Sequence, residues 1–216
     1  MNRIAVLLLV LLLAACSSKP RAPDWEMNAH GSLDRYLKAF MEGDVRVESA
    51  EFGRARDELA RTGDAGLVAR AELTRCALLV GSLVFGPCPG FEALRLDAPA
   101  AEGAYADYLA GKALPKDAPL LPPAHRAVAA ASADAASVKA IADPLARLVA
   151  AGVLFETGRA SPDVLQLAAD TASAQGWRRP LLAWLGAQAR RAELAGAVQE
   201  AERLRRRIAL VLSQPA

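Results

Sequence analysis

Residues 143–176, DPLARLVAAGVLFETGRASPDVLQLAADTASAQG, contain the clearest structural signals in this 216-residue chain. Asp143 and Ser161 are each followed by proline, which places an N-cap residue before a proline at the first helical position. Gly158 and Gly176 are suited to end the two helices that start there. The stretch therefore predicts two successive helices joined by a short turn.

The same punctuation continues to the C-terminus. Arg179 and Pro180 open a further helix, in which we expect Trp184 and Leu185 to be core residues. Gly196 ends that helix, and a last helix follows. Its predicted inward-facing residues are Val198, Ala201, Leu204, Ile208, Val211 and Leu212. The two helices should form an antiparallel hairpin.

This last hairpin resembles a tetratricopeptide-type repeat. Small Ala189 and Ala201 face each other across the glycine turn, and the large apolar Leu185 lies one turn earlier. The departures are that Ala192 and Arg205 occupy the usual aromatic positions, and that no steady 34-residue period is established. The resemblance implies a solenoid of helical hairpins, and an irregular α-bundle is the alternative.

Composition favours helices over the rest of the chain. Alanine fills 49 of 216 positions, whereas isoleucine occurs three times and threonine four times. This mixture favours helices and leaves few β-branched residues for strands. We therefore predict an all-α fold, an array of antiparallel helical hairpins.

A proline-rich stretch interrupts the helical pattern near the middle of the chain. Residues 115–123 contain four prolines, which break regular structure. We expect this connection to separate an N-terminal helical half, residues 32–114, from a C-terminal helical half, residues 124–213. Ser32 is the predicted N-cap of the first helix.

The N-terminus has the pattern of a bacterial export signal. Arg3 precedes an uninterrupted apolar run over residues 4–15, and Cys16 follows. The run is shorter than the roughly 20 apolar residues of a membrane-spanning helix. The sequence Leu-Ala-Ala-Cys ending at Cys16 resembles the lipobox of bacterial lipoproteins. A secretory signal with an incidental cysteine and an apolar first helix are the alternatives.

The lipobox resemblance implies an anchored protein. Residues 1–15 would be removed, and Cys16 would be acylated. Pro20 and Pro23, among polar residues, predict a flexible tether for the rest of residues 16–31. A covalent lipid on Cys16 is the one attached group we expect, and two or more acyl chains make an anchor hard to reverse. Ser17 stands where enterobacterial lipoproteins kept at the inner membrane have Asp. The resemblance therefore implies the outer membrane, with the protein facing the periplasm.

Two further cysteines would share this oxidising compartment. Cys76 falls in a helical pattern, and Cys88 lies in the turn Gly-Pro-Cys-Pro-Gly. A disulfide between them would close a loop of about a dozen residues and could stabilise the fold by roughly 3 kcal/mol. The alternative is that Cys76 is simply a small buried apolar residue.

Charge is nearly balanced but unevenly distributed. Without the signal the chain carries a formal charge of +1, which gives no reason to expect a nucleic-acid partner. Residues 177–216 carry +5, and residues 16–176 carry −4. The candidate contact surface consists of four arginines of the last helix, Arg203, Arg205, Arg206 and Arg207. They could meet an acidic partner or anionic lipid, or they could simply form a solvated face.

Residues for catalysis or metal binding are sparse. The chain has two histidines, His30 and His125, and no HExxH, GxSxG, P-loop or GxGxxG motif. A glycan hydrolase needs one or two carboxylates in a groove. Glu48, Glu51 and Glu58 are available, but their arginine-rich surroundings predict solvated helix faces. We expect no metal site and no enzymatic activity.

These observations favour a non-catalytic scaffold or adaptor for envelope proteins, held at the membrane by its lipid. The partner would be another envelope protein. A peptidoglycan hydrolase and a carrier of a small apolar ligand are the alternatives.

Overall fold

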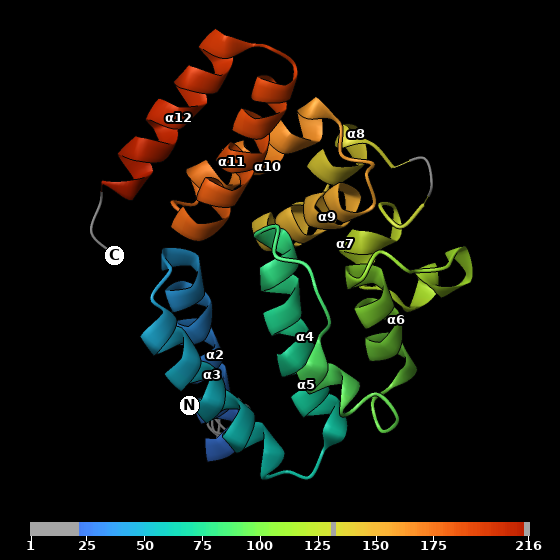
Figure 1. Cartoon of the computed structure of the whole chain (residues 1–216). Coiled ribbons are helices and arrows are strands. Elements are labelled where there is room, and N and C mark those ends of the chain that lie inside the picture. The colour runs from blue at the N-terminus through green and yellow to red at the C-terminus, as the bar shows by residue number, and fades with distance from the viewer. Residues whose placement is uncertain (1–21, 131–132, 214–216) are drawn as a thin grey trace, which may run out of the picture.

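The computed structural model describes residues 22–130 and 133–213, so Cys16 and the expected signal peptide lie outside the described residues. Within these ranges all regular structure is helical (Figure 1), and consecutive helices pack in hairpin-like pairs. The elements are α2 (Asp24–Glu42), α3 (Val45–Ala60), α4 (Ala65–Gly81), α5 (Pro89–Glu92), α6 (Ala100–Leu109), the 3-10 helix η1 (Pro115–Leu120), α7 (Pro123–Arg126), α8 (Ala135–Lys139), α9 (Pro144–Glu156), α10 (Pro162–Ala174), α11 (Arg178–Leu194) and α12 (Val198–Leu212). The predicted all-α fold is confirmed.

Side-chain caps explain where several helices begin. Asp44, Asp64, Asp143 and Ser161 each accept a hydrogen bond from a backbone N–H group of the following first turn. The N–H groups of the first turn have no partner inside the helix, so each cap typically contributes about 1 kcal/mol to stability. The starts of α9 and α10 are those predicted from the Asp-Pro and Ser-Pro pairs.

The first helix begins earlier than the sequence pattern predicts. α2 starts at Asp24, so the prediction of a tether is wrong for residues 24–31. Asp24 and Glu26 lie in the first turn, where carboxylates interact favourably with the helix dipole. Ser32 is not an N-cap but lies buried within α2, where its Oγ accepts a hydrogen bond from Arg35 at 3.0 Å.

The two helical halves share one core. Residues 115–123 hold η1 and the start of α7, as expected of a proline-rich connection. However, α4, which precedes this connection in the chain, packs against α9, which follows it (Figure 1). Val149 and Val153 of α9 are buried in the same cluster as Leu73 and Cys76 of α4. The connection therefore joins two parts of one packed body.

Two glycines bring α4 and α9 close together. A Cβ atom on Gly152 would collide with the carbonyl oxygen of Val80, and one on Gly81 would lie 3.5 Å from Leu148. The end of α4 also meets α11, because Nε1 of the fully buried Trp184 donates to the carbonyl oxygen of Gly81 at 2.9 Å. Three helices thus meet at the C-terminal end of α4.

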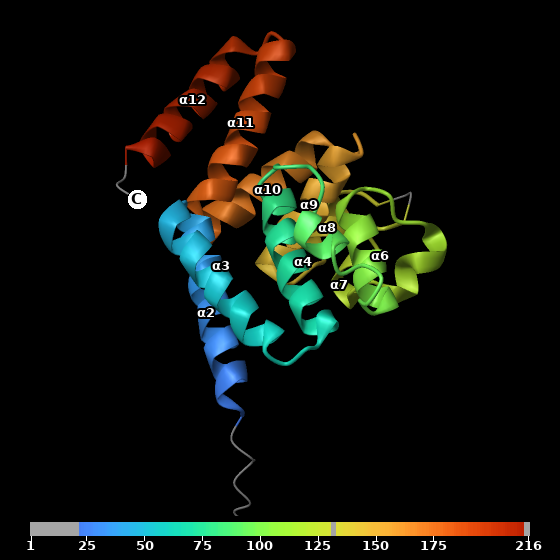
Figure 2. The ribbon, with the colours of Figure 1, turned by 60° about the horizontal axis from the view of Figure 1, so that its bottom comes forward.

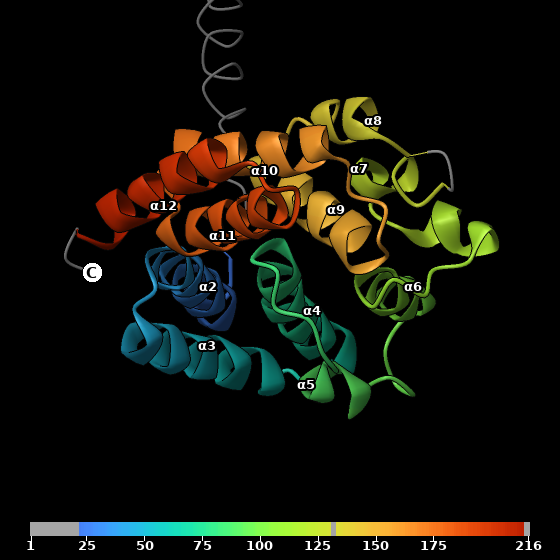
Figure 3. The same ribbon diagram turned by 45° about the horizontal axis from the view of Figure 1, so that its top comes forward.

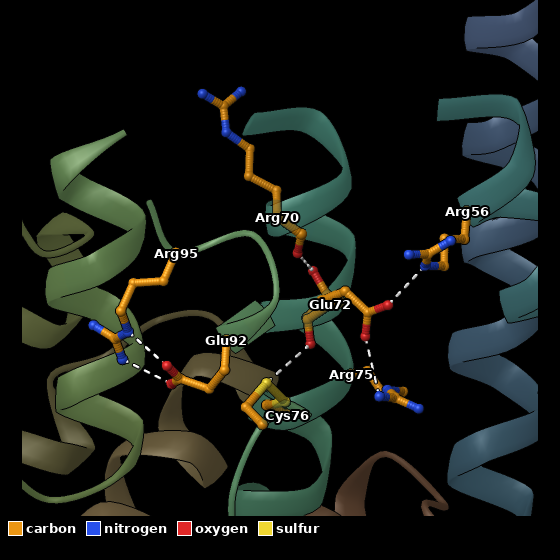
Figure 4. The surroundings of a disulfide bond; sticks show 9 residues. Arg56, Arg70, Glu72, Arg75, Cys76, Glu92 and Arg95 are labelled. Carbon is orange, nitrogen blue, oxygen red and sulfur yellow. Dashed lines mark hydrogen bonds and ion pairs between the residues drawn. A yellow bond between two sulfur atoms is a disulfide. The ribbon is translucent and has the colours of Figure 1, made fainter. Parts of the chain in front are cut away.

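A disulfide joins Cys76 of α4 to Cys88, which precedes α5, with a Cα–Cα distance of 6.1 Å (Figure 4). This agrees with the sequence prediction. Phe91 of α5 is fully buried beside it in the same cluster. The bridge and this aromatic ring together fix the segment that follows α4.

The contact of α4 with α9 predicts opposite effects for two glycine substitutions. Gly152→Ala should lower the free energy of unfolding by about 2 kcal/mol, because the new methyl group overpacks the core. Gly186→Ala in α11 should raise it by about 0.5–1 kcal/mol, because a Cβ there meets nothing within 4 Å. Urea unfolding of the two variants measures the difference. Equal effects would contradict the close approach of α4 and α9.

Candidate binding surface

The α11–α12 hairpin lies at the end of the molecule away from the start of α2 (Figures 1 and 2). At the start of α11, the guanidinium carbon of Arg179 lies 4.1 Å from the ring centroid of Phe40, near the end of α2. Arg179 also pairs with Glu48 of α3 at 2.7 Å. These contacts fix the base of the hairpin on the α2–α3 pair, at the end opposite Asp24.

Small residues form the interior of this hairpin. Ala189 and Ala192 of α11 are buried in one cluster with Ala201 and Leu204 of α12. The turn between the helices contains Gly196, whose φ of 68° favours glycine. α11 in turn lies between α12 and the helices α2 and α4 (Figure 3). The predicted hairpin and its small-residue interior are confirmed.

The last helix packs on α11 through one face and exposes much of the rest. Val198 and Leu212, predicted to face inward, are 64 % and 55 % exposed, whereas Ile208 and Val211 are half-buried. The reason is that α12 is the last helix described, and no later described element covers it. The prediction of a six-residue inward face is therefore wrong at its two ends.

The four candidate arginines do not form one patch. Arg203 and Arg206 line a shared hollow beside the Gly196 turn, where Arg203 pairs with Glu200 at 2.7 Å. Arg207 is half-buried. Arg205 lies about half a turn around the helix from Arg203, and it pairs with Glu193 of α11 at 2.7 Å. Helical spacing places the exposed Leu210 in line with Arg203 and Arg206. We call Arg203, Arg206 and Leu210 the α12 outer face.

A groove of about 380 Å³, lined by both apolar and polar residues, runs between α10, α11 and α12. Asp163 and Gln166 line it from α10, Gln188 and Arg191 from α11, and Glu200 from α12. These side chains include hydrogen-bond donors and acceptors, and they comprise anionic, cationic and neutral groups. The hairpin end of the molecule thus has the α12 outer face and a groove with both apolar and polar walls side by side.

The three glutamates considered for glycan hydrolysis each pair with an arginine. The pairs are Glu48 with Arg179 at 2.7 Å, Glu51 with Arg54 at 2.6 Å and Glu58 with Arg61 at 2.9 Å. The prediction that Glu51 is solvated is wrong, because it is 6 % exposed. Burial alone would raise its pKa, but the hydrogen bond and charge of Arg35, with the charge of Arg54, hold the pKa below its usual range. Such a carboxylate differs from the protonated acid of a glycosidase.

His125 is buried in an aromatic cluster rather than exposed in a loop. Its ring lies 5.5 Å from that of Tyr105 and 5.0 Å from that of Tyr108, measured between centroids. Its Nδ1 atom has no hydrogen-bond partner among the described residues. Burial lowers the pKa of His125 to about 4, against the weaker opposing effect of Asp143. The imidazole is therefore neutral at pH 7.

Comparison with known proteins gives no family for this chain. No family model, curated protein or solved structure matches it. In the described part of the chain, no group of three or more His, Cys, Asp or Glu side chains is arranged to hold a metal ion. None of the helices searched there has the length and apolar character needed to cross a membrane.

The buried imidazole predicts a pH dependence of stability. The unfolded chain binds a proton near pH 6.5, whereas folded His125 does so only near pH 4. The stabilising effect of the neutral ring is therefore complete above pH 6.5 and is lost as the pH falls. His125 should reduce the free energy of unfolding by about 2 kcal/mol between pH 7 and pH 5.

Urea unfolding of the wild-type protein and of His125→Phe at both pH values separates the contribution of His125 from that of the carboxylates. The phenylalanine variant should show the smaller loss between pH 7 and pH 5. An equal loss in both proteins would mean that His125 titrates normally in the folded state.

Proposed function

We propose that the protein is a lipid-anchored, non-catalytic binding protein of the bacterial envelope, which holds another envelope protein at its α11–α12 end. The observation that carries this proposal is the placement of that hairpin, at the end of the molecule opposite the start of α2 (Figures 1 and 2). The anchor itself is proposed from the lipobox-like sequence at Cys16.

Chain lengths support a partner in the aqueous space rather than lipid. Residues 16–23 separate the proposed acylated cysteine from α2 and can span at most about 28 Å. α2 has 19 residues and is therefore about 28 Å long. With α2 upright on the membrane, the α12 outer face would lie at the far end of α2 from the lipid. This favours a protein partner over anionic head groups for the arginines.

Surface chemistry supports an acidic, partly apolar segment as the partner's contribution. Residues 177–216 carry a net charge of +5, and the α12 outer face combines Arg203 and Arg206 with the exposed Leu210. Complementary charge speeds association and excludes partners of the same sign. An apolar side chain beside the arginines adds affinity through burial. The neighbouring groove, with its apolar and polar walls, could bind an extended peptide.

The non-catalytic part of the proposal rests on the candidate carboxylates. Each of the three glutamates is paired with an arginine, and the most buried one, Glu51, has a lowered pKa. A general acid for glycan cleavage needs the opposite shift. A peptidoglycan hydrolase is therefore the weaker alternative.

In-cell photo-crosslinking tests this proposal. Leu210→p-benzoylphenylalanine in the membrane-anchored protein should give a reproducible crosslink to an envelope protein, because Leu210 lies on the α12 outer face. The matched control is the same substitution at Leu96, which is 98 % exposed on a distant loop. This control should give no reproducible crosslink. Arg206→Glu should weaken the Leu210 crosslink several-fold, and Cys16→Ala should abolish it.

Crosslinks to lipid alone would contradict the proposal of a protein partner. Equal crosslinking from Leu96 and Leu210 would contradict the assignment of the surface.

A further inference from the structure

A second pocket lies on the other side of the molecule from the α12 outer face, where α4 and α6 meet the corner between η1 and α7. Its volume is about 440 Å³, within the roughly 300–1,000 Å³ typical of small-molecule sites. The larger apolar residues that line it are Leu73, Tyr105, Leu120, Leu121, Pro122 and Pro123. We call it the α6 pocket.

The apolar wall of the α6 pocket is held in place from behind. Leu121 is 1 % exposed, so its position is set by the core. Tyr105 stacks on Tyr108 with 6.1 Å between ring centroids, and its ring lies 5.5 Å from that of His125. Pro122 and Pro123 restrict the backbone of the remaining wall. The pocket is therefore largely formed before any ligand enters.

The polar side of the pocket consists of Arg70, Thr74, Glu102 and Arg126, and each arginine is oriented through Nε. Arg70 donates from Nε to Glu102 at 2.6 Å, and Arg126 donates from Nε to the carbonyl oxygen of Leu121 at 2.9 Å. Glu102 balances the charge of Arg70. None of the ion pairs formed among the described residues includes Arg126. The pocket thus combines an apolar wall with one uncompensated positive charge.

We propose that the α6 pocket binds a small apolar molecule that carries one carboxylate. The apolar body would lie against Leu121 and Tyr105, and the carboxylate would accept hydrogen bonds from the terminal amino groups of Arg126. A guanidinium already fixed through Nε presents the remaining N–H groups in the planar geometry that carboxylates match. This site is independent of the α12 outer face and of the proposed protein partner.

Titration with dodecanoate, below its micelle-forming concentration, tests the site. The secreted Cys16→Ala chain avoids detergent, and methyl NMR with calorimetry gives both location and affinity. We expect saturable shifts at the methyl groups of Leu120 and Leu121. Dodecanol, which has the same chain without the charge, should bind about tenfold more weakly.

Three variants separate this site from nonspecific binding. Arg126→Gln should weaken dodecanoate binding about tenfold, whereas Arg203→Gln on α12 should leave it unchanged. Ala101→Trp should block binding, because Ala101 lines the pocket from the exposed first turn of α6. Thr74→Trp, on the opposite wall, serves the same purpose if Ala101→Trp fails to fold.

Equal affinities for dodecanoate and dodecanol, or unchanged binding by Arg126→Gln, would overturn the carboxylate assignment. Binding that survives both tryptophan variants, or no binding at all, would overturn the site. Arg206→Glu should retain dodecanoate binding, so failure of this inference and failure of the proposed adaptor function are distinguishable.

Discussion

The hydrogen bond from Trp184 to the carbonyl oxygen of Gly81 connects α11 of the C-terminal half to α4 of the N-terminal half inside the core. Trp184 is fully buried, so loss of the bond would leave buried polar groups unpaired at a cost of about 1–3 kcal/mol. Gly152 of α9 approaches the same end of α4 so closely that no larger residue fits. The position of α11, and with it the α12 outer face, therefore depends on how α4 ends.

Buried carboxylates complement this alanine-rich core. Alanine contributes little buried area per residue, so packing alone specifies helix positions weakly. Glu72 of α4, with its side chain 4 % exposed, pairs with Arg56 of α3 at 2.9 Å and with Arg75 at 3.1 Å (Figure 4). Glu102 similarly ties α6 to α4 through Arg70. The arginines of these pairs are partly exposed, but a buried carboxylate that lost its arginine would remain desolvated and unpaired, so these contacts oppose alternative helix arrangements.

Short sequence patterns predict the features of this fold that depend on neighbouring residues in the chain. The caps at Asp143 and Ser161, the all-α class, the last hairpin and the cysteine pair could all be found in the sequence. Pro20 and Pro23 predict a linker near the start of α2, whereas Asp24 and Glu26 in its first turn are the signal of a helix start. The burial of Glu51 and the α6 pocket depend on contacts between separate helices. Helical periodicity alone, however, is enough to predict that Arg205 lies on a different face of the last helix from Arg203.

Native-state hydrogen exchange at increasing urea concentrations tests most directly whether α4 unites the two halves. If the fold is one packed body around the end of α4, amides of α4, α9 and the first half of α11 should exchange with the same free energy as global unfolding. α12 should open at lower free energy, because it packs mainly on α11. Protection of α9, α10 and α11 that persists after α4 has exchanged would contradict this account.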